Sequence, residues 1–325
     1  MRVTLLLVTL LLAALALSIA FGETPLSLGQ YRDALADPGS PVREILFGIR
    51  APRGCCAALV GGALGMAGAV MQGLLRNPLA EPGVLGVSAW SAVAAAVVIA
   101  LGLGAAPGAI EGAALAGAIA AGAVVALLAA RFREPETLIL FGVALAALGG
   151  ALTALIFNLS PSPVTTAEVL SWLQGSVANR DWPDLAWALV PMAVGAALCA
   201  YSGVGLRMLT LGEESAALSG LPMARLRVAA IAGAALLTGA SVALAGVIGF
   251  VGLAAPHLVR GSASDDPAAT LAPSALAGAI LLALADLLAR VIPTAEELRL
   301  GVVTALFGAP LFALIAWRAA RSWRA

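Results

Sequence analysis

The segment from Gly54 to Leu75 most constrains the fold, because it is an uninterrupted apolar run rich in Gly and Ala. Arg50 and Arg53 precede it and Arg76 follows it. A helix needs about 20 residues to cross a bilayer, so the run predicts a membrane-spanning helix with a charged group at each interface. Three of its glycines fall on nearly one helical face, which predicts close packing against another helix: Gly61, Gly65 and Gly68.

The composition extends this prediction to the whole chain. Hydrophobic residues make up 61% of the 325 and charged residues 11%, and the mean hydropathy is +1.01. Soluble domains are roughly 45–50% apolar and about 25% charged. We therefore expect an all-α polytopic membrane protein, with residues 1–325 forming a single permease-like domain.

About ten transmembrane helices are predicted from the positions of the apolar runs. The runs are residues 3–21, 54–75, 84–103, 110–130, 137–159, 182–201, 228–247, 250–260, 271–290 and 298–317. Residues 22–53 are expected to form an external loop, and 203–227 a cytoplasmic insert. Residues 165–177 suit a short interfacial helix. A weak internal similarity between 62–73 and 235–246 would fit inverted repeats.

The arginines indicate the orientation of the chain. Ten spans place both termini on one side, and cytoplasmic loops carry an excess of basic residues. The side with the termini holds Arg2, Arg76, Arg131, Arg133, Arg207, Arg225, Arg227, Arg260, Arg318, Arg321 and Arg324. The other side holds Arg32, Arg43, Arg50, Arg53, Arg180, Arg290 and Arg299. Both termini are therefore predicted to be cytoplasmic, in a multi-pass protein of the bacterial inner (plasma) membrane.

The chain contains no lysine, which excludes a phosphate-binding loop of the type that places a lysine on ATP phosphates. If ATP drives this protein, another chain must hydrolyse it, so we do not expect an enzyme. The three cysteines, Cys55, Cys56 and Cys199, are odd in number and lie in or beside apolar runs. They predict small buried side chains, with no disulfide framework and no metal site.

Four motifs occur in order along the chain. They are R-A-P-R at 50–53 with R-N-P-L-A-E-P-G-V-L-G-V-S at 76–88, L-G-E-E-S-A-A-L-S-G-L at 211–221, G-V-I-G-F-V-G-L-A-A-P-H-L-V-R at 246–260, and A-D-L-L-A-R at 285–290 with its continuation to Pro310. This set resembles the FecCD-type permeases, the membrane subunits of type II ABC importers for ferric siderophores, haem or vitamin B12. The resemblance implies a fold like that of the vitamin B12 importer permeases.

The resemblance implies that external arginines receive acidic residues of a substrate-binding protein. The residues at those motif positions are Arg50, Arg53 and Arg290. Guanidinium–carboxylate pairs would fix the docking register. The alternatives are arginines that only reach the membrane interface, and an internal pair between Arg290 and Asp286 four residues earlier.

The resemblance also implies that the insert carries a coupling helix, which rests in a groove of the ATPase subunit. Its residues are Leu211, Gly212, Glu213, Glu214, Ala216, Gly220 and Leu221. From the residues alone, an ordinary solvated loop is slightly favoured over a coupling helix.

A further set of motif residues is expected to be structural, because Pro and Gly end helices and permit tight reversals. The set is Asn77, Pro78, Pro82, Gly83, Gly249, Gly252, Pro256 and His257. His257 is the only histidine. A packed, hydrogen-bonded role is favoured over a proton relay, and no second ligand supports a metal site.

Two departures from the family pattern stand out. Arg299 occupies a position where proline is usual, and Asp266-Pro267-Ala268 stands where Asp-His-Arg is common, just after Asp265. The first adds an external cation and changes the docking surface, and the second loosens a cytoplasmic contact.

The expected function is the permease of an ABC importer that moves an iron-siderophore-type chelate, with haem and vitamin B12 as alternatives. A proton-coupled secondary transporter using Asp286 or His257 is the alternative from another class. The expected partners are two ATPase subunits, a periplasmic or lipid-anchored binding protein, a second permease copy and membrane lipid, and no nucleic acid. No cofactor is expected on this chain, since ATP and Mg²⁺ belong to the ATPase.

Overall fold

The computed structural model describes residues 2–132, 134–260, 266–294 and 296–322, and within these ranges the chain forms helices and no strand. Each of the ten predicted apolar runs contains a helix. These are α1 (Arg2–Ala20), α4 (Ala51–Leu74), α5 (Val87–Ala100), α6 (Ala109–Arg131), α7 (Pro135–Leu159), α9 (Trp182–Leu209), α11 (Met223–Ala245), α12 (Val251–Val259), α13 (Pro267–Val291) and α14 (Leu300–Ser322). Seven are long and apolar enough to cross a membrane; α5, α12 and the apolar part of α14 are shorter.

Helices α4 and α11 form the centre of the bundle, since they are the most buried of the long apolar helices. Small residues allow α4 to pack tightly, as its sequence predicted. A Cβ on Gly61 would overlap the Gly278 carbonyl of α13, and a Cβ on Gly68 would overlap the Gly252 carbonyl of α12. Helix α4 contains the first of the two internally similar segments, 62–73, and α11 contains the second, 235–246, up to its last residue.

The segment predicted as an external loop, residues 22–53, contains three helical pieces: α2 (Leu28–Ala36), α3 (Pro41–Arg43) and the π-helical turn η1 (Glu44–Arg50). Ser27 and Gln30 form a capping box that starts α2. Pro41 starts α3 at a position where its missing N–H costs nothing. The run from Pro41 to Leu74 is thus one continuous helical rod, which brings Arg50 and Arg53 into its first half.

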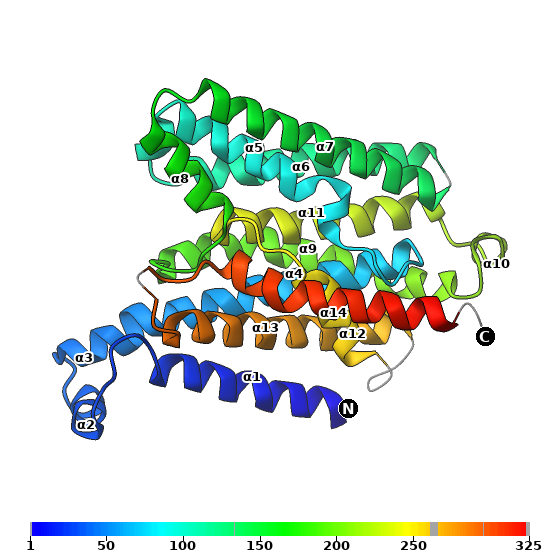
Figure 1. Ribbon diagram of the computed structural model, residues 1–325. Helices are drawn as coiled ribbons and strands as arrows, with labels where there is room; N and C mark the ends of the chain where they lie inside the picture. The colour runs from blue at the N-terminus through cyan, green and yellow to red at the C-terminus, as the bar shows by residue number, and fades with distance from the viewer. Residues whose placement is uncertain (1, 133, 261–265, 295, 323–325) are drawn as a thin grey trace.

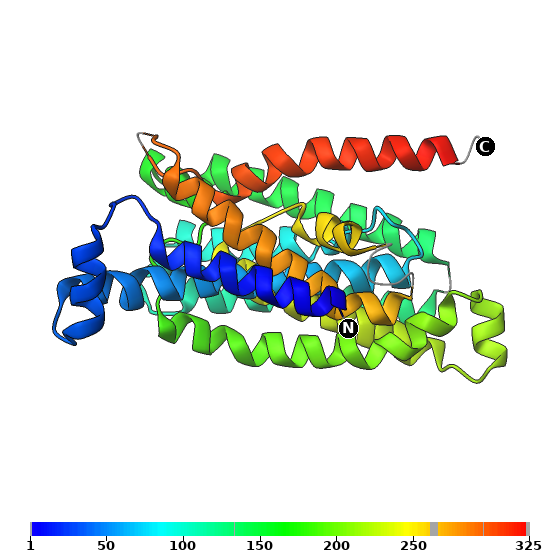
Figure 2. The same cartoon turned by 90° about the horizontal axis from the view of Figure 1, so that it is seen from below.

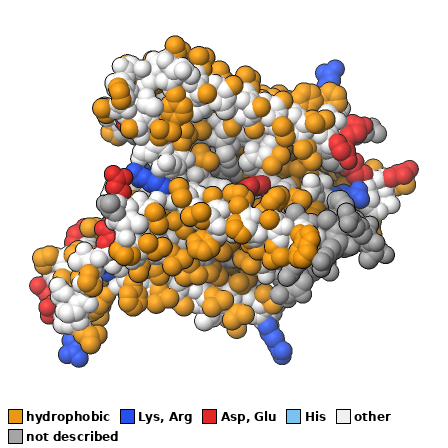
Figure 3. Space-filling model, in the orientation of Figure 1, with side chains coloured by type: hydrophobic (Ala, Val, Ile, Leu, Met, Phe, Trp, Pro, Cys, Tyr) orange, Lys and Arg blue, Asp and Glu red, His pale blue; other side chains and the backbone are white. Residues whose placement is uncertain are grey.

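The bundle has two distinct ends (Figure 1). Helices α2, α3 and α8 (Pro163–Leu173) gather at one end, which we call the α2 end, and α8 covers most of the segment predicted as an interfacial helix. At the other end, the α10 end, lie the short helix α10 (Glu213–Leu218), the start of α1 and the finish of α14. On the face shown in Figure 3, the surface between the ends is mainly hydrophobic and the charged side chains are concentrated toward the ends. That the α10 end faces the cytoplasm stays a prediction.

Two chain breaks lie inside the bundle, and both fall where Pro and Gly were expected to end helices. Between α4 and α5 the chain passes through the 3₁₀ turn η2 (Pro82–Leu85) to Gly86, whose φ is 78°. Between α11 and α12 it turns at Gly246 and Phe250, with φ of 71° and 67°. Because α5 and α12 are too short to span about 30 Å, each begins within the bundle.

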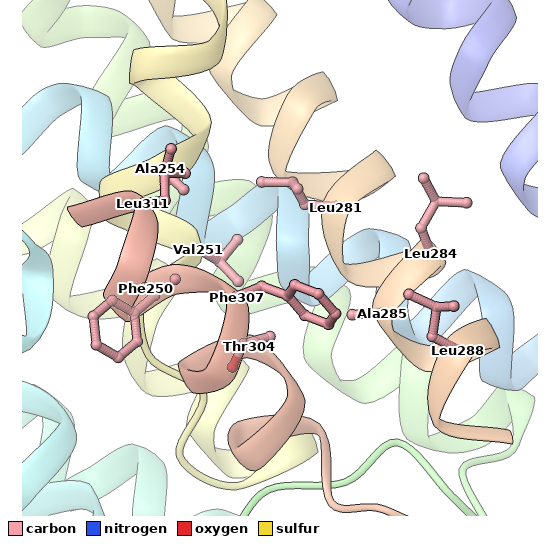
Figure 4. A pocket seen from close by; sticks show the side chains of 11 residues that line it. Phe250, Val251, Ala254, Leu281, Leu284, Ala285, Leu288, Thr304, Phe307 and Leu311 are labelled. Carbon is pink, nitrogen blue, oxygen red and sulfur yellow. The ribbon is translucent and has the colours of Figure 1, made fainter. Parts of the chain in front are cut away.

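Helix α14 lies along one side of the bundle, apart from the central helices (Figure 2). An apolar cavity of about 260 Å³ separates part of it from α12 and α13. Phe307 reaches from α14 toward α13 across this space, and Phe250 borders it at the start of α12 (Figure 4). The lining is almost wholly hydrocarbon, so this cavity offers no chemistry and leaves α14 less tightly packed than its neighbours.

Candidate functional sites at the two ends of the bundle

Four charged side chains form a buried ion cluster at the α2 end: Arg53, Asp286, Arg290 and Glu297. Arg53 donates through Nε and Nη2 to one Asp286 oxygen, at 2.9 and 2.8 Å, and also binds Glu297. Arg290 pairs with the other Asp286 oxygen at 3.1 Å. The Asp286 side chain is 0% exposed, so two guanidinium groups neutralise a carboxylate that has no access to water.

Arg50 and Arg290 also hold the end of α1. Arg50 donates to the carbonyl oxygens of Ala20 and Thr24, at 2.9 and 2.6 Å. Arg290 donates to the Ser18 hydroxyl at 2.6 Å. Cations at a helix C-terminus satisfy carbonyl groups that lack helical partners and oppose the negative end of the helix dipole.

The structure thus places the three predicted docking arginines together, but buried and bonded within the chain. In this conformation they tie α1, α4 and α13 to one another. Contact with a binding protein stays a prediction, and it would require these internal bonds to rearrange. The sequence reading missed Glu297 and Ser18 as their partners, because these residues are brought close only by the fold.

Helix α10 projects at the opposite end, bracketed by Gly212 and Gly220 with φ of 99° and 85°. Ala216 is its buried anchor, and its carbonyl accepts a bond from the Leu221 N–H. Leu211 and Leu218 are 74% and 85% exposed. These two large apolar side chains face outward, and the helix beside them is anchored by one alanine. Such a surface suits contact with another protein.

The two adjacent glutamates of α10 have different surroundings. Glu213 turns inward and pairs with Arg227 of α11 at 2.8 Å, while Glu214 is exposed. Arg227 also donates to the Phe132 carbonyl at the end of α6, at 3.1 Å. A polar hollow of about 750 Å³ opens between α6, α10 and α11, with Arg131 and Glu214 in its lining.

The motif residues around the chain breaks hold α12 against the segment that follows α4. His257 donates from Nε2 to the Pro78 carbonyl at 2.8 Å, which agrees with the hydrogen-bonded role expected for it. The Asn77 side chain accepts from the Leu79 N–H, and Pro82 lies against Gly252. Gly83 lies in η2, Gly249 precedes α12, and Pro256 is inside it.

Glu81 joins the two breaks and was missed by the sequence reading. Its carboxylate accepts from the Phe250 N–H at 2.8 Å, next to the N-terminus of α12. Burial raises the pKa of the Glu81 carboxyl, and the Phe250 N–H partly opposes this shift. An acidic residue amid apolar neighbours, between two prolines, is the signal that could have found it.

Both departures from the family pattern make local contacts. Arg299 donates to the Ser171 hydroxyl of α8 at 2.7 Å. Asp266 caps α13 by accepting from the Ala268 N–H at 2.9 Å and pairs with Arg207 at 2.7 Å. Asp265 lies outside the described residues.

Among the described residues, no group of three or more His, Cys, Asp or Glu side chains could hold a metal ion. The three cysteines are free thiols.

Comparison with known proteins assigns the chain to a family. The model of the FecCD transport family matches residues 10–318. The chain belongs to this family. The Vitamin B12 import system permease protein BtuC of Escherichia coli O157:H7 is 40% identical over 320 residues, covering 96% of this chain and 94% of that protein. An uncharacterised ABC transporter permease protein of Bacillus subtilis, YvrB, is 40% identical over 289 residues, or 86% and 81% of the two chains.

A solved structure described as an inward-facing conformation of a metal-chelate type ABC transporter superposes on the FecCD-family fold seen here. The TM-score is 0.88 and the identity 30%, with 98% of this chain and 99% of the other covered. The predicted family and the all-helical permease fold are therefore confirmed. The protein is a multi-pass permease of the inner membrane, and its relatives are transport subunits rather than enzymes.

The geometry gives little support to proton coupling in this FecCD-family permease. The Asp286 carboxylate is already engaged by two arginines, Arg53 and Arg290. The His257 ring donates to the backbone carbonyl of Pro78.

Proposed function

We propose that this chain is the membrane subunit of a type II ABC importer that carries a bulky metal chelate. The observation that carries the proposal is α10, a short helix that presents Leu211, Leu218 and Glu214 beyond the end of an otherwise lipid-facing bundle. The chain has no lysine for a phosphate-binding loop of its own, so a separate ATPase would hydrolyse the ATP. The surface formed by α10 is where we expect that ATPase to bind.

The substrate class rests on two kinds of support. The family resemblance of the sequence motifs gives an iron-siderophore chelate as the first expectation. The similarity to vitamin B12 permeases favours a corrinoid. Both are bulky metal chelates, and haem is a third member of the class.

The assembly we propose has two copies of this chain beside a shared pathway, two ATPases at the α10 end and a binding protein at the α2 end. Many large apolar side chains of α7 and α14 are exposed, which suits contact with lipid or with a second copy. A hollow of about 650 Å³ beside α14 is lined by Gln174, Gly249 and Phe250 and would border the pathway.

Purification of the tagged protein in mild detergent tests this proposal. An ATP-binding cassette subunit should co-purify, and Glu214→Arg should remove it. Because Glu213 pairs within the chain, Glu214 is the sharper choice for testing the contact. A preparation without ATPase that transports under a proton gradient would overturn the proposal.

The substrate is tested in proteoliposomes that hold the whole complex. ATP-dependent uptake of labelled cobalamin, a ferric siderophore or haem would identify the chelate. Uptake of none of the three, by a complex that hydrolyses ATP in response to a different binding protein, would contradict the substrate class.

A further inference from the structure

The position of α10 depends on very few attachments. It has six residues, too few to be a stable helix alone. It is joined to α9 and α11 through Gly212 and Gly220 and packs inward through Ala216. The ion pair from Glu213 to Arg227 also links it directly to the beginning of α11.

Arg227 is held firmly on its own side of this pair. Its side chain is 7% exposed, against 31% for Glu213. A second hydrogen bond runs from its guanidinium to the Phe132 carbonyl, so the same side chain fixes the end of α6. A displacement of Glu213 would therefore shift both the beginning of α11 and the end of α6.

Helices α6 and α11 are packed too closely to slide independently. A Cβ on Gly239 would overlap the Ala118 side chain, and a Cβ on Gly122 would overlap that of Ala235. Close packing of this kind transmits displacement, because interiors have few voids to absorb it. At about 1.5 Å per residue, the 23 residues of α11 extend roughly 34 Å.

The far end of α11 is bonded to the segments that position α8 and α14. The Ser176 N–H donates to the Ala245 carbonyl at 2.8 Å. The N–H groups of Leu300 and Gly301 donate to the carbonyls of Gly175 and Gln174, each at 3.0 Å. We call residues 172–176, 245–247 and 299–301 the α8–α14 junction.

We propose that the Glu213–Arg227 pair makes α11 the element through which movement of α10 reaches the α8–α14 junction, at the opposite end of the bundle. Arg227 is then a positioning residue. It touches neither the substrate nor the ATPase, and it acts by holding α10 to α11. The inference rests on the proposed function, in which an ATPase moves α10.

The test uses the complex of permease and ATPase in lipid nanodiscs. The three native cysteines are replaced by alanine, and one cysteine is introduced at Leu306, an exposed position of α14 near the junction. The rate at which a water-soluble maleimide labels this cysteine is compared between the nucleotide-free and ATP–vanadate states. For the unaltered pair we expect a change of at least about fivefold, the lower range of measured coupling between sites.

Three variants and one matched control are compared. Arg227→Met should leave ATPase co-purification and basal hydrolysis close to the parent, yet reduce the nucleotide-dependent change to below about twofold. Glu213→Ala should reduce the nucleotide-dependent change by a similar factor in every preparation that retains the ATPase. The charge exchange E213R/R227E should restore part of it, because the pair returns while the bond to Phe132 does not. Arg225→Ala removes an exposed cation two residues away and should behave as the parent.

The outcomes separate the two proposals. Loss of the ATPase from the parent complex would overturn the proposed function. A complex that assembles and keeps its full response in Glu213→Ala would overturn the role of the pair alone. Should Arg227→Met fail to fold, Glu213→Ala still decides, because Glu213 is on the more exposed side of the pair.

Discussion

The two ends of the bundle use the same chemistry for opposite purposes. At the α2 end, Arg53 and Arg290 enclose the fully buried Asp286, so these charged groups pair with one another and join helices. At the α10 end, one pair holds a short helix while Leu218 and Glu214 face outward. The arginines of the α2 end are therefore engaged within the chain, whereas the α10 end leaves a large apolar side chain and a carboxylate exposed.

The largest expected effect is at the α2 end. Asp286→Asn would leave Arg53 and Arg290 buried without their shared counter-charge, which costs about 3–5 kcal/mol. We expect a much lower yield of folded protein. We also expect a lower midpoint of thermal unfolding, measured by size-exclusion chromatography of heated samples. Glu297→Gln is the control, because Arg53 keeps Asp286 and the loss should be smaller. Unchanged unfolding of Asp286→Asn would show that the buried cluster does not stabilise this end.

At the α10 end the same measurement should show almost nothing. Leu218 is 85% exposed, so Leu218→Ser should change stability by less than about 0.5 kcal/mol. Burial of one leucine in a partner groove is worth about 1.5–3 kcal/mol, so the affinity for the ATPase should fall at least tenfold. Titration of the purified ATPase against the permease measures this change. A stability loss with unchanged affinity would reverse the comparison between the ends.

How much of this contrast the sequence predicts depends on the range of each interaction. The ten helices follow from the lengths of apolar runs, and the limits of α10 follow from Gly212 and Gly220, all of which are local signals. Arg53 meets Asp286 across 233 residues of sequence, and no local pattern encodes that pairing. Of the two arginines around Asp286, only Arg290, four residues away on the same helix, could be paired with it from the local sequence.

The helices within residues 22–53 were missed for a different physical reason. They are short and of mixed polarity, so hydrophobic periodicity gives no signal. The sequence nevertheless carries signals for their first residues, namely the capping pair Ser27 and Gln30 and the proline Pro41.

A smaller effect is expected where the two chain breaks meet, between the ends. Glu81→Ala removes the acceptor of the Phe250 N–H, and an unsatisfied buried donor costs about 1–3 kcal/mol. Glu81→Gln keeps an oxygen at the same place and should lose less than half as much. Hydrogen exchange of the 246–250 segment should rise in the alanine variant only. Equal exchange in both variants would mean that the carboxylate charge, and not the hydrogen bond, holds the breaks together.

The smallest expected effect concerns Arg299, where the family usually has proline. Its bond to Ser171 is partly exposed, whereas the backbone bonds of Leu300 and Gly301 hold the same two segments without any side chain. Arg299→Ala and Ser171→Ala should each cost about 0.5–1.5 kcal/mol, and the double variant should cost no more than either one, because both remove a single hydrogen bond. Thermal unfolding of the three variants measures this. Additive losses would show that Arg299 has a second role at the α2 end, and contact with the binding protein would then be the first to examine.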